Sequence, residues 1–351
     1  MRINQKIKIG RRWIGEGEKT FIVAELSCNH QQNYNIARKT IKAIKDSGAD
    51  AVKLATNHPD GLTIDCDNKF FQIKQGTVWD GLTLYKLYQK IDAPWQWQPK
   101  LKKYAEKLGL ICFSTPIEYE SADFVEKMDM PAYKIASFEI TDYDFVKYIA
   151  RKGKPVIIST GIAEKNEIKE VMKICRDAGN RKIILLKCTS SYPATAQEMN
   201  LKTIPDMKKE FGVEVGLSDH SLSPIVPVVA VALGAKMIEK HFILDRKLGG
   251  PDATFSLEPA EFKKMVSDIR EAEKSFGKIT YELSAKTKRN RMFSRSLFII
   301  KDVIKGEKFS NENVRSIRPG YGLHPKYFKK VIGKKAKTDI KRGTPLLLKH
   351  F

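Results

Sequence analysis

The sequence lacks any long apolar run, and it has few cysteines. No stretch of about eighteen apolar residues could span a bilayer, and the basic N-terminus lacks the apolar core and cleavage site of a signal peptide. We therefore expect a cytoplasmic protein with no membrane partner. Five cysteines are scattered without a CxxC pair or a Cys/His cluster, which argues against disulfides and structural zinc.

Acidic residues are in the minority. The chain of 351 residues has 63 Lys and Arg against 41 Asp and Glu, and its formal net charge is +22. This charge would attract a polyanion or a small phosphorylated substrate. Basic residues are densest at 286–295 and 326–337, but no recognisable nucleic-acid-binding motif accompanies them. We interpret the charge as a solvated surface and expect no nucleic-acid partner; a non-catalytic polyanion-binding protein is a remote alternative.

Nucleotide-binding glycine motifs are also missing. Without GxGxxG or GxxxxGK[ST], nothing favours an open doubly wound sheet. Instead, short β-branched or apolar segments alternate with amphipathic ones for eight rounds over about 250 residues, which predicts an α/β fold of the (β/α)8 TIM-barrel type. The predicted strands are FIVAEL, AVKLAT, ICFSTP, AYKIAS, PVIIST, KIILLKC, EVGLSD and MIEKHFI, beginning at Phe21, Ala51, Ile111, Ala132, Pro155, Lys182, Glu214 and Met237.

The pattern changes near the C-terminus. A charged segment at 284–295 reads as a linker, and short strands with turns follow it. We predict a barrel domain over 1–283 and a small β-rich domain over 296–351. Within the barrel, residues 57–99 are too many for an ordinary loop and carry three tryptophans, as expected of a segment that covers a site.

Nearly every predicted strand ends in a polar residue, and barrel enzymes carry their catalytic groups at these ends. Lys53, Lys134 and Lys187 recur there among several Ser and Thr hydroxyls. Such a donor-rich pocket suits a ligand with both a phosphate and a carboxylate. The alternative is that the lysines reach solvent or pair with a carboxylate such as Glu25.

Two histidines end adjacent strands. His220 and His241 could meet over the barrel and hold a metal ion, with positions left for water and substrate oxygens. From spacing alone, a structural histidine bonded to a carbonyl group is an equally open interpretation.

The order of these motifs resembles a known family. FIVAELSCNH, AVKLAT, CFSTP, YKIASFE, ISTG, LKCTSSYP, VGLSDHS, IEKHF, GGPDATFSL and RPGYGLHP are similar to the nonulosonic acid synthases, the sialic acid synthase family. YKIASFE, WDGLTLYKLY, PDATFSL and GLHPK are most similar to its pseudaminic acid synthase branch. The C-terminal segment is similar to an SAF (antifreeze-like) domain.

The resemblance implies a reaction. It is a metal-dependent condensation of phosphoenolpyruvate with a 2,4-diacetamido-2,4,6-trideoxy-hexose of the altrose type and water, which yields a nonulosonic acid and phosphate. The implied metal is Mn²⁺, Mg²⁺ or another divalent ion. N-acetylneuraminate or legionaminate synthesis is the alternative reaction within the same family.

The resemblance also implies roles for individual residues. Glu25, Lys53, Lys134 and Asp252 would be catalytic, and His220 and His241 would bind the metal. The implied substrate-binding residues are Thr115, Ser137, Glu139, Ser159, Ser190, Tyr192, Ser218 and Arg318.

In this family the arginine at the position of Arg318 reaches the other subunit's site and holds the sugar's N-acetyl group, which implies a domain-swapped homodimer. Two departures bear on substrate contacts. The family often has Gln where Ala55 stands, and sialic acid synthases commonly have Asn in place of Ser190. A shorter hydroxyl at 190 leaves room for a bridging water or for Ser191 to replace the amide.

Overall fold

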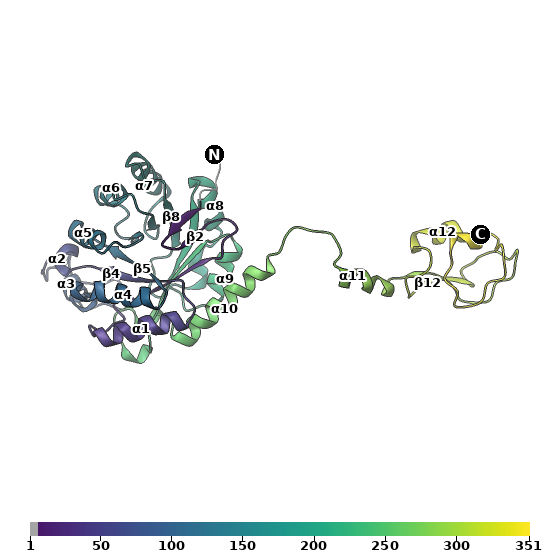
Figure 1. The fold of residues 1–351 in the computed structure, drawn as a ribbon, viewed down its shortest axis with the longest axis horizontal. Coiled ribbons are helices and arrows are strands. Elements are labelled where there is room, and N and C mark those ends of the chain that lie inside the picture. The colour runs from purple at the N-terminus through teal and green to yellow at the C-terminus, as the bar shows by residue number, and fades with distance from the viewer. Residues whose placement is uncertain (1–5) are drawn as a thin grey trace. The chain divides into compact units, whose positions relative to one another are not determined.

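The chain folds into two compact units, Met1–Gly277 and Lys278–Phe351, in a computed structural model that describes residues 6–351 (Figure 1). The first unit contains a closed barrel of parallel strands, in which β10 pairs with β3 to complete the ring. This confirms the predicted fold class. The barrel strands are β3 (Phe21–Glu25), β4 (Ala51–Thr56), β5 (Ile111–Pro116), β6 (Tyr133–Ile135), β7 (Val156–Ser159), β8 (Ile183–Cys188), β9 (Glu214–Asp219) and β10 (Met237–His241).

Helices cover the outside of the barrel (Figure 1). Helix α1 shows why the sequence places them there: the Asn33 side chain caps its first turn by accepting from the amides of Asn35 and Ile36, and Ala37 and Ile41 lie on its buried face. The covering helices are α1 (Tyr34–Asp46), α4 (Gln98–Lys107), α5 (Tyr119–Lys127), α6 (Tyr143–Arg151), α7 (Lys165–Asp177), α8 (Thr203–Phe211), α9 (Ile225–Ala232) and α10 (Pro259–Ser275).

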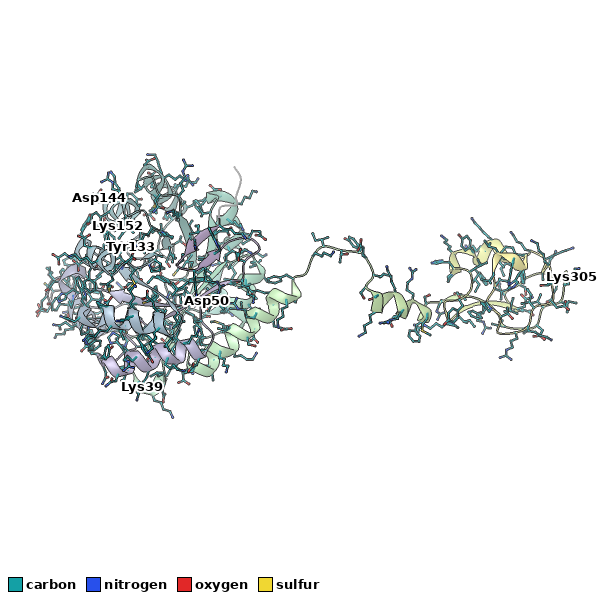
Figure 2. All side chains as sticks on the ribbon, viewed as in Figure 1. Lys39, Asp50, Tyr133, Asp144, Lys152 and Lys305 are labelled. Atoms are coloured by element: carbon teal, nitrogen blue, oxygen red, sulfur yellow. The ribbon has the colours of Figure 1, made fainter. Side chains whose placement is uncertain are left out.

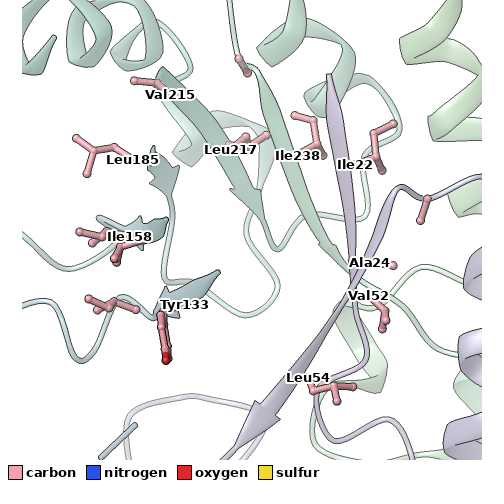
Figure 3. Packing of buried hydrophobic residues seen from close by; sticks show 14 of the residues in the cluster. Ile22, Ala24, Val52, Leu54, Tyr133, Ile158, Leu185, Val215, Leu217 and Ile238 are labelled. Atoms are coloured by element: carbon pink, nitrogen blue, oxygen red, sulfur yellow. The ribbon is translucent and has the colours of Figure 1, made fainter. Parts of the chain in front are cut away.

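Two apolar layers meet at the barrel wall, because successive side chains of a strand point to opposite faces. The outer layer packs between strands and helices, and Ile22, Val52 and Ile238 belong to it (Figure 3). The inner layer fills the lower part of the barrel interior with residues such as Val23 and Phe113.

A hairpin of β1 (Ile7–Ile9) and β2 (Arg12–Ile14) adds Ile7, Ile9 and Ile14 to the inner layer. Asp50, which is labelled in Figure 2, accepts hydrogen bonds from the amide of Ile22 and from the guanidinium of Arg270. These contacts pack the N-terminal end of the barrel, and we call the opposite, C-terminal end the mouth.

The segment 57–99 is not a bare loop. It forms α2 (Pro59–Leu62), α3 (Leu84–Ile91) and the single turn η1 (Trp95–Trp97). Two of its indoles are tied to strand-end segments: Trp95 Nε1 donates to Asn57 O at 2.9 Å, and Trp79 Nε1 donates to Pro251 O at 3.0 Å. The segment therefore lies against the mouth.

The second unit has a core of its own, in which Leu297, Phe309 and Leu346 are buried. Its elements are α11 (Ala285–Asn290), η5 (Arg291–Phe293), β11 (Ser296–Ile299), β12 (Val314–Ile317), η6 (Pro325–Tyr327), α12 (Phe328–Val331) and η7 (Leu348–His350). Residues 284–295, predicted as a linker, thus include a short helix. The unit has twenty Lys and Arg, among them Lys305 (Figure 2), and only five acidic residues.

Two sequence expectations can be compared directly with the structure. All five cysteines are free, and four of them are buried. No helix within residues 6–351 has the length and apolar character needed to cross a membrane.

Candidate active site

A polar layer lies on top of the inner apolar layer at the mouth. The alternation that points Val23 and Ala51 into the apolar interior also points Glu25 and Lys53, two residues further along each strand, into the space above it. The same holds around the ring. The inward polar residues at the strand ends are Glu25, Lys53, Thr115, Lys134, Ser159, Ser218, Glu239 and His241.

Two buried lysines meet two carboxylates in this layer. Lys53 and Lys134 are only 2% and 1% exposed. Lys53 Nζ lies 2.8 Å from Glu25 Oε1 and 3.2 Å from Glu239 Oε1, and Lys134 Nζ lies 3.4 Å from the same Glu239 oxygen. Ser218 also donates to that oxygen at 3.1 Å. Glu239 is therefore the centre of a charge cluster of Glu25, Lys53, Lys134 and Glu239.

Burial acts differently on the members of this cluster. Burial alone would raise the pKa of Glu25, but Lys53 and then His241 outweigh it and lower that pKa to about 2. Burial would lower the pKa of Lys53, yet Glu239 and Glu25 raise it. For Lys134, the effect of burial exceeds the opposite effect of the Glu239 charge, so its pKa is lowered. The charge of Lys134 is thus less fully balanced by neighbouring carboxylates than that of Lys53. An anionic ligand would therefore stabilise the charged form of Lys134 more than that of Lys53.

Hydroxyl groups gather beside Lys134. Its ammonium donates to Ser159 Oγ at 2.8 Å, and the hydroxyls of Ser137 and Ser190 lie 2.9 Å apart. A Cβ on Gly161 would overlap Ser190 Oγ and lie 3.1 Å from Ser137 Cβ, so glycine is required there for the two serines to approach. These groups offer the donors that a phosphate or carboxylate would need.

The two predicted metal-binding histidines lie side by side. Their ring centroids are 5.4 Å apart with planes at 52°. His220 Nδ1 lies 3.0 Å from Thr189 O and donates to it in the matching tautomer, which leaves Nε2 for a ligand. His241 lies between carboxylates, with Nε2 3.3 Å from Glu25 and Nδ1 3.4 Å from Asp252.

The charges around His241 oppose the effect of its burial. Burial would lower its pKa, but Glu25 and Asp252 raise it. The pKa of Asp252 is lowered, because His241 and the hydroxyl of Ser27, 2.5 Å away, outweigh its burial. A negative environment of this kind attracts a cation.

The donor set fits a divalent ion in an open site. Within residues 6–351, no group of three or more His, Cys, Asp and Glu side chains could hold a metal by itself. Two imidazoles would therefore need oxygen ligands from water or substrate, which is the arrangement of a catalytic rather than a structural site.

Aromatic rings enclose the histidines. Tyr192 packs on His220 with centroids 4.5 Å apart, and Phe255 packs edge-on against His241 at 5.0 Å. Trp79 of the 57–99 segment contacts Tyr192 at 5.4 Å. This segment therefore reaches the site and reduces its exposure to water, as its length suggested.

The structure brings most of the predicted residues together. The convergent ones are Glu25, Lys53, Lys134, Ser137, Ser159, Ser190, Tyr192, Ser218, His220, His241 and Asp252. Thr115 is inward on β5, and the pKa of Glu139, beyond β6, is raised by burial despite Lys134 and Lys53 nearby. Arg318 belongs to the second unit.

Sequence reasoning misjudged two strand-end residues. Lys187 does not join the lysine pair; its ammonium binds Cys188 O at 2.7 Å and Thr189 Oγ1 at 3.0 Å, because position 187 alternates with the inward Leu186. Glu239 received no role, although period-two alternation in MIEKH places it on the face of His241. That alternation was the available signal.

The barrel has lysines, hydroxyls and paired imidazoles at its mouth, and a small basic domain follows it. Comparison with known families shows which class of synthase has this arrangement. A family model described as NeuB family matches residues 40–281, and one described as SAF domain matches residues 294–351. The chain belongs to the NeuB family, whose synthases transfer carbon from phosphoenolpyruvate and generally depend on a divalent metal.

Individual members of the family are similar to this chain over most of its length. The chain is 48% identical over 329 residues to the pseudaminic acid synthase of Campylobacter jejuni (94% of this chain, 96% of that protein) and 44% identical to the one of Helicobacter pylori (93% and 96%). Among solved structures, it is similar to the N-acetylneuraminic acid synthetase of Leptospira borgpetersenii in complex with citrate. There the TM-score is 0.73 at 29% identity, over 82% of this chain and 95% of that one.

Replacing Glu239 with Gln tests its place at the centre of the cluster. Gln keeps the shape but removes the charge that compensates both lysines, so we expect kcat to fall by ~100-fold, about 2.7 kcal/mol, and thermal stability to drop. Turnover and thermal melting are measured together.

The matched control is Glu214→Gln, a buried carboxylate at the N-terminal end of β9 that pairs with Lys208 at 3.2 Å. This variant should lose stability and keep kcat. Equal kcat in the two variants would contradict the assignment.

Proposed function

We propose that this chain is a pseudaminic acid synthase. It condenses phosphoenolpyruvate with a 2,4-diacetamido-2,4,6-trideoxy-hexose of the altrose type and water, and releases the nonulosonic acid and phosphate. The observation that carries the proposal is the convergence of Lys53 and Lys134 with His220 and His241 at one end of one barrel. The identity of 44–48% to pseudaminic acid synthases supports the choice of sugar.

Phosphoenolpyruvate would bind at the lysine pair. Its carboxylate and phosphate need several donors at once, and the ammonium of Lys134 lies beside the hydroxyl groups of its neighbouring strands. Because burial disfavours the charged form of Lys134, an incoming anion is stabilised by pairing with it. The proposed donors are Lys53, Lys134, Thr115, Ser137, Ser159, Ser190 and Ser218.

His220 and His241 would hold a divalent ion, Mn²⁺ or Mg²⁺. When bound, such an ion supplies Lewis acidity toward the sugar aldehyde. The residues around it have their own tasks. Glu25, with a pKa of about 2, remains a carboxylate at neutral pH and can accept a proton or orient water, and Asp252 on the other side of His241 is ionised as well.

The sugar would lie on the aromatic side of the histidines. We assign Glu139, Tyr192 and Asp252 to contacts with the sugar, and Arg318 of a second subunit would hold an acetamido group. This requires a domain-swapped homodimer. The surplus of basic residues in the second unit supports docking near anionic substrates. We place the reaction in the cytoplasm.

The reaction is tested by measuring phosphate release from phosphoenolpyruvate with Mn²⁺ and three sugars: the 2,4-diacetamido altrose, the legionaminate precursor and N-acetylmannosamine. We expect the altrose sugar to have the highest kcat/KM and His241→Ala to abolish turnover without unfolding the barrel. A preference for either other sugar would favour legionaminate or N-acetylneuraminate synthesis. No release with any sugar, together with salt-sensitive polyanion binding, would contradict an enzymatic role.

The swapped dimer is tested by co-expressing two inactive variants, Arg318→Ala and His241→Ala. In a mixed dimer, the barrel of the Arg318→Ala chain keeps both histidines and receives Arg318 from the partner, so one of its two sites is complete. We expect roughly one quarter of wild-type activity after random pairing. If each second unit serves its own barrel, no site is complete and activity stays absent.

A further inference from the structure

The inward row of β4 has an opening in it. Ala51 belongs to the inner apolar layer and Lys53 to the charge cluster, and the same alternation turns Ala55 and then Asn57 toward the mouth. Of the six residues in β4, only Ala55 is not fully buried. Ala55 has only a methyl group and is partly exposed between the buried Lys53 and Asn57, and we call this position the opening.

Unpaired polar groups flank this opening. Asn57 is 2% exposed, yet neither atom of its side-chain amide has a hydrogen-bond partner within residues 6–351. Thr115, which is the register partner of Ala55 on β5, is 6% exposed, and its hydroxyl has no partner in the same range. Buried polar groups are almost always hydrogen-bonded. Thr115 is already a proposed donor to phosphoenolpyruvate, so the two amide atoms of Asn57 are the ones that require a further explanation.

Poor local packing does not supply that explanation, because the outward side chains of the same strand ends are well satisfied. Thr56 donates to Gln98 Oε1 at 2.6 Å and lies 2.7 Å from Ser114 Oγ. Gln98 in turn donates to Ala55 O at 3.0 Å. The backbone of Asn57 is held too, through Trp95. Within residues 55–57, the side-chain amide of Asn57 is the one buried polar group without a partner among the described residues, which points to a ligand beside it.

We propose that Asn57, beside Ala55, forms a subsite for a secondary amide of the sugar substrate. A side-chain amide is complementary to such a group: Asn57 Nδ2 donates to the acetamido carbonyl, and Oδ1 accepts from the acetamido N–H. An anion would leave Oδ1 unpaired, so a phosphate or carboxylate fits less well. The proposal rests on the proposed function, whose substrate has two acetamido groups. Arg318 is assigned the acetamido group at C2, the one that N-acetylmannosamine also carries, so the subsite takes the one at C4.

The test compares kcat/KM for the 2,4-diacetamido sugar with that for its analogue bearing a free amine at C4. Asn57→Leu keeps the side-chain size and removes both hydrogen bonds. We expect it to lower kcat/KM for the diacetamido sugar by ~10–100-fold, to change the analogue much less, and to leave the KM for phosphoenolpyruvate unchanged. Ala55→Val, which fills the opening, should raise the KM of the diacetamido sugar in the same selective way.

Thr56→Val is the matched control, since it removes a hydrogen bond on the outward face of the same strand end. It should lower thermal stability without changing the ratio between the two sugars. If Asn57→Leu does not fold, Asn57→Ser replaces it with the same expectation. Equal losses on both sugars, or no loss, would overturn the subsite alone, whereas a wild-type protein inactive with every sugar would overturn the proposed function and the subsite with it.

Discussion

Two ammonium groups in the interior of the barrel set the conditions for the rest of this structure. Moving an isolated charge into an apolar interior is very costly, so Lys53 and Lys134 must remain close to Glu25 and Glu239. These four residues lie on strands β3, β4, β6 and β10. Their charges can meet only if the strands close into a ring with one relative register. The hairpin and the inner apolar layer close the opposite end, which leaves the charges facing the mouth.

The charge cluster also divides the site into two halves. On one side, Lys134 and the serines of β7 and its neighbours present donors suited to an anion. On the other, His241 lies between Glu25 and Asp252, an environment suited to a cation. Glu25 belongs to both halves because it contacts Lys53 and His241 alike. In the proposed function, the site would hold an enol phosphate and a metal ion next to each other while its own charges stay paired.

Much of this could be predicted from the sequence because strand alternation is a strong local signal. The eight strand segments, the polar strand ends and the approach of His220 to His241 follow from period and order. Lys187 was misplaced because a one-residue difference in phase moves a side chain to the other face of the wall. Glu239 was passed over because its partners come from strands far apart in sequence.

Other features have no local signal at all. Asn57 is buried where the 57–99 segment folds back over the strand end and Trp95 donates to its carbonyl group, a contact that strand alternation does not predict. The proposed place of Arg318 at the site depends on a second subunit, so neither the sequence pattern nor one chain's fold determines it.

Titration of phosphoenolpyruvate into the metal-free protein tests the central claim most directly. Lys134 and Lys187 both end strands at the mouth, but only Lys134 belongs to the charge cluster. We expect Lys134→Met to weaken phosphoenolpyruvate binding by ~30-fold or more, because a charge-assisted contact in a buried site is lost. Lys187→Met should weaken binding by less than about twofold. Unchanged binding in Lys134→Met, or equal weakening in both variants, would contradict the account.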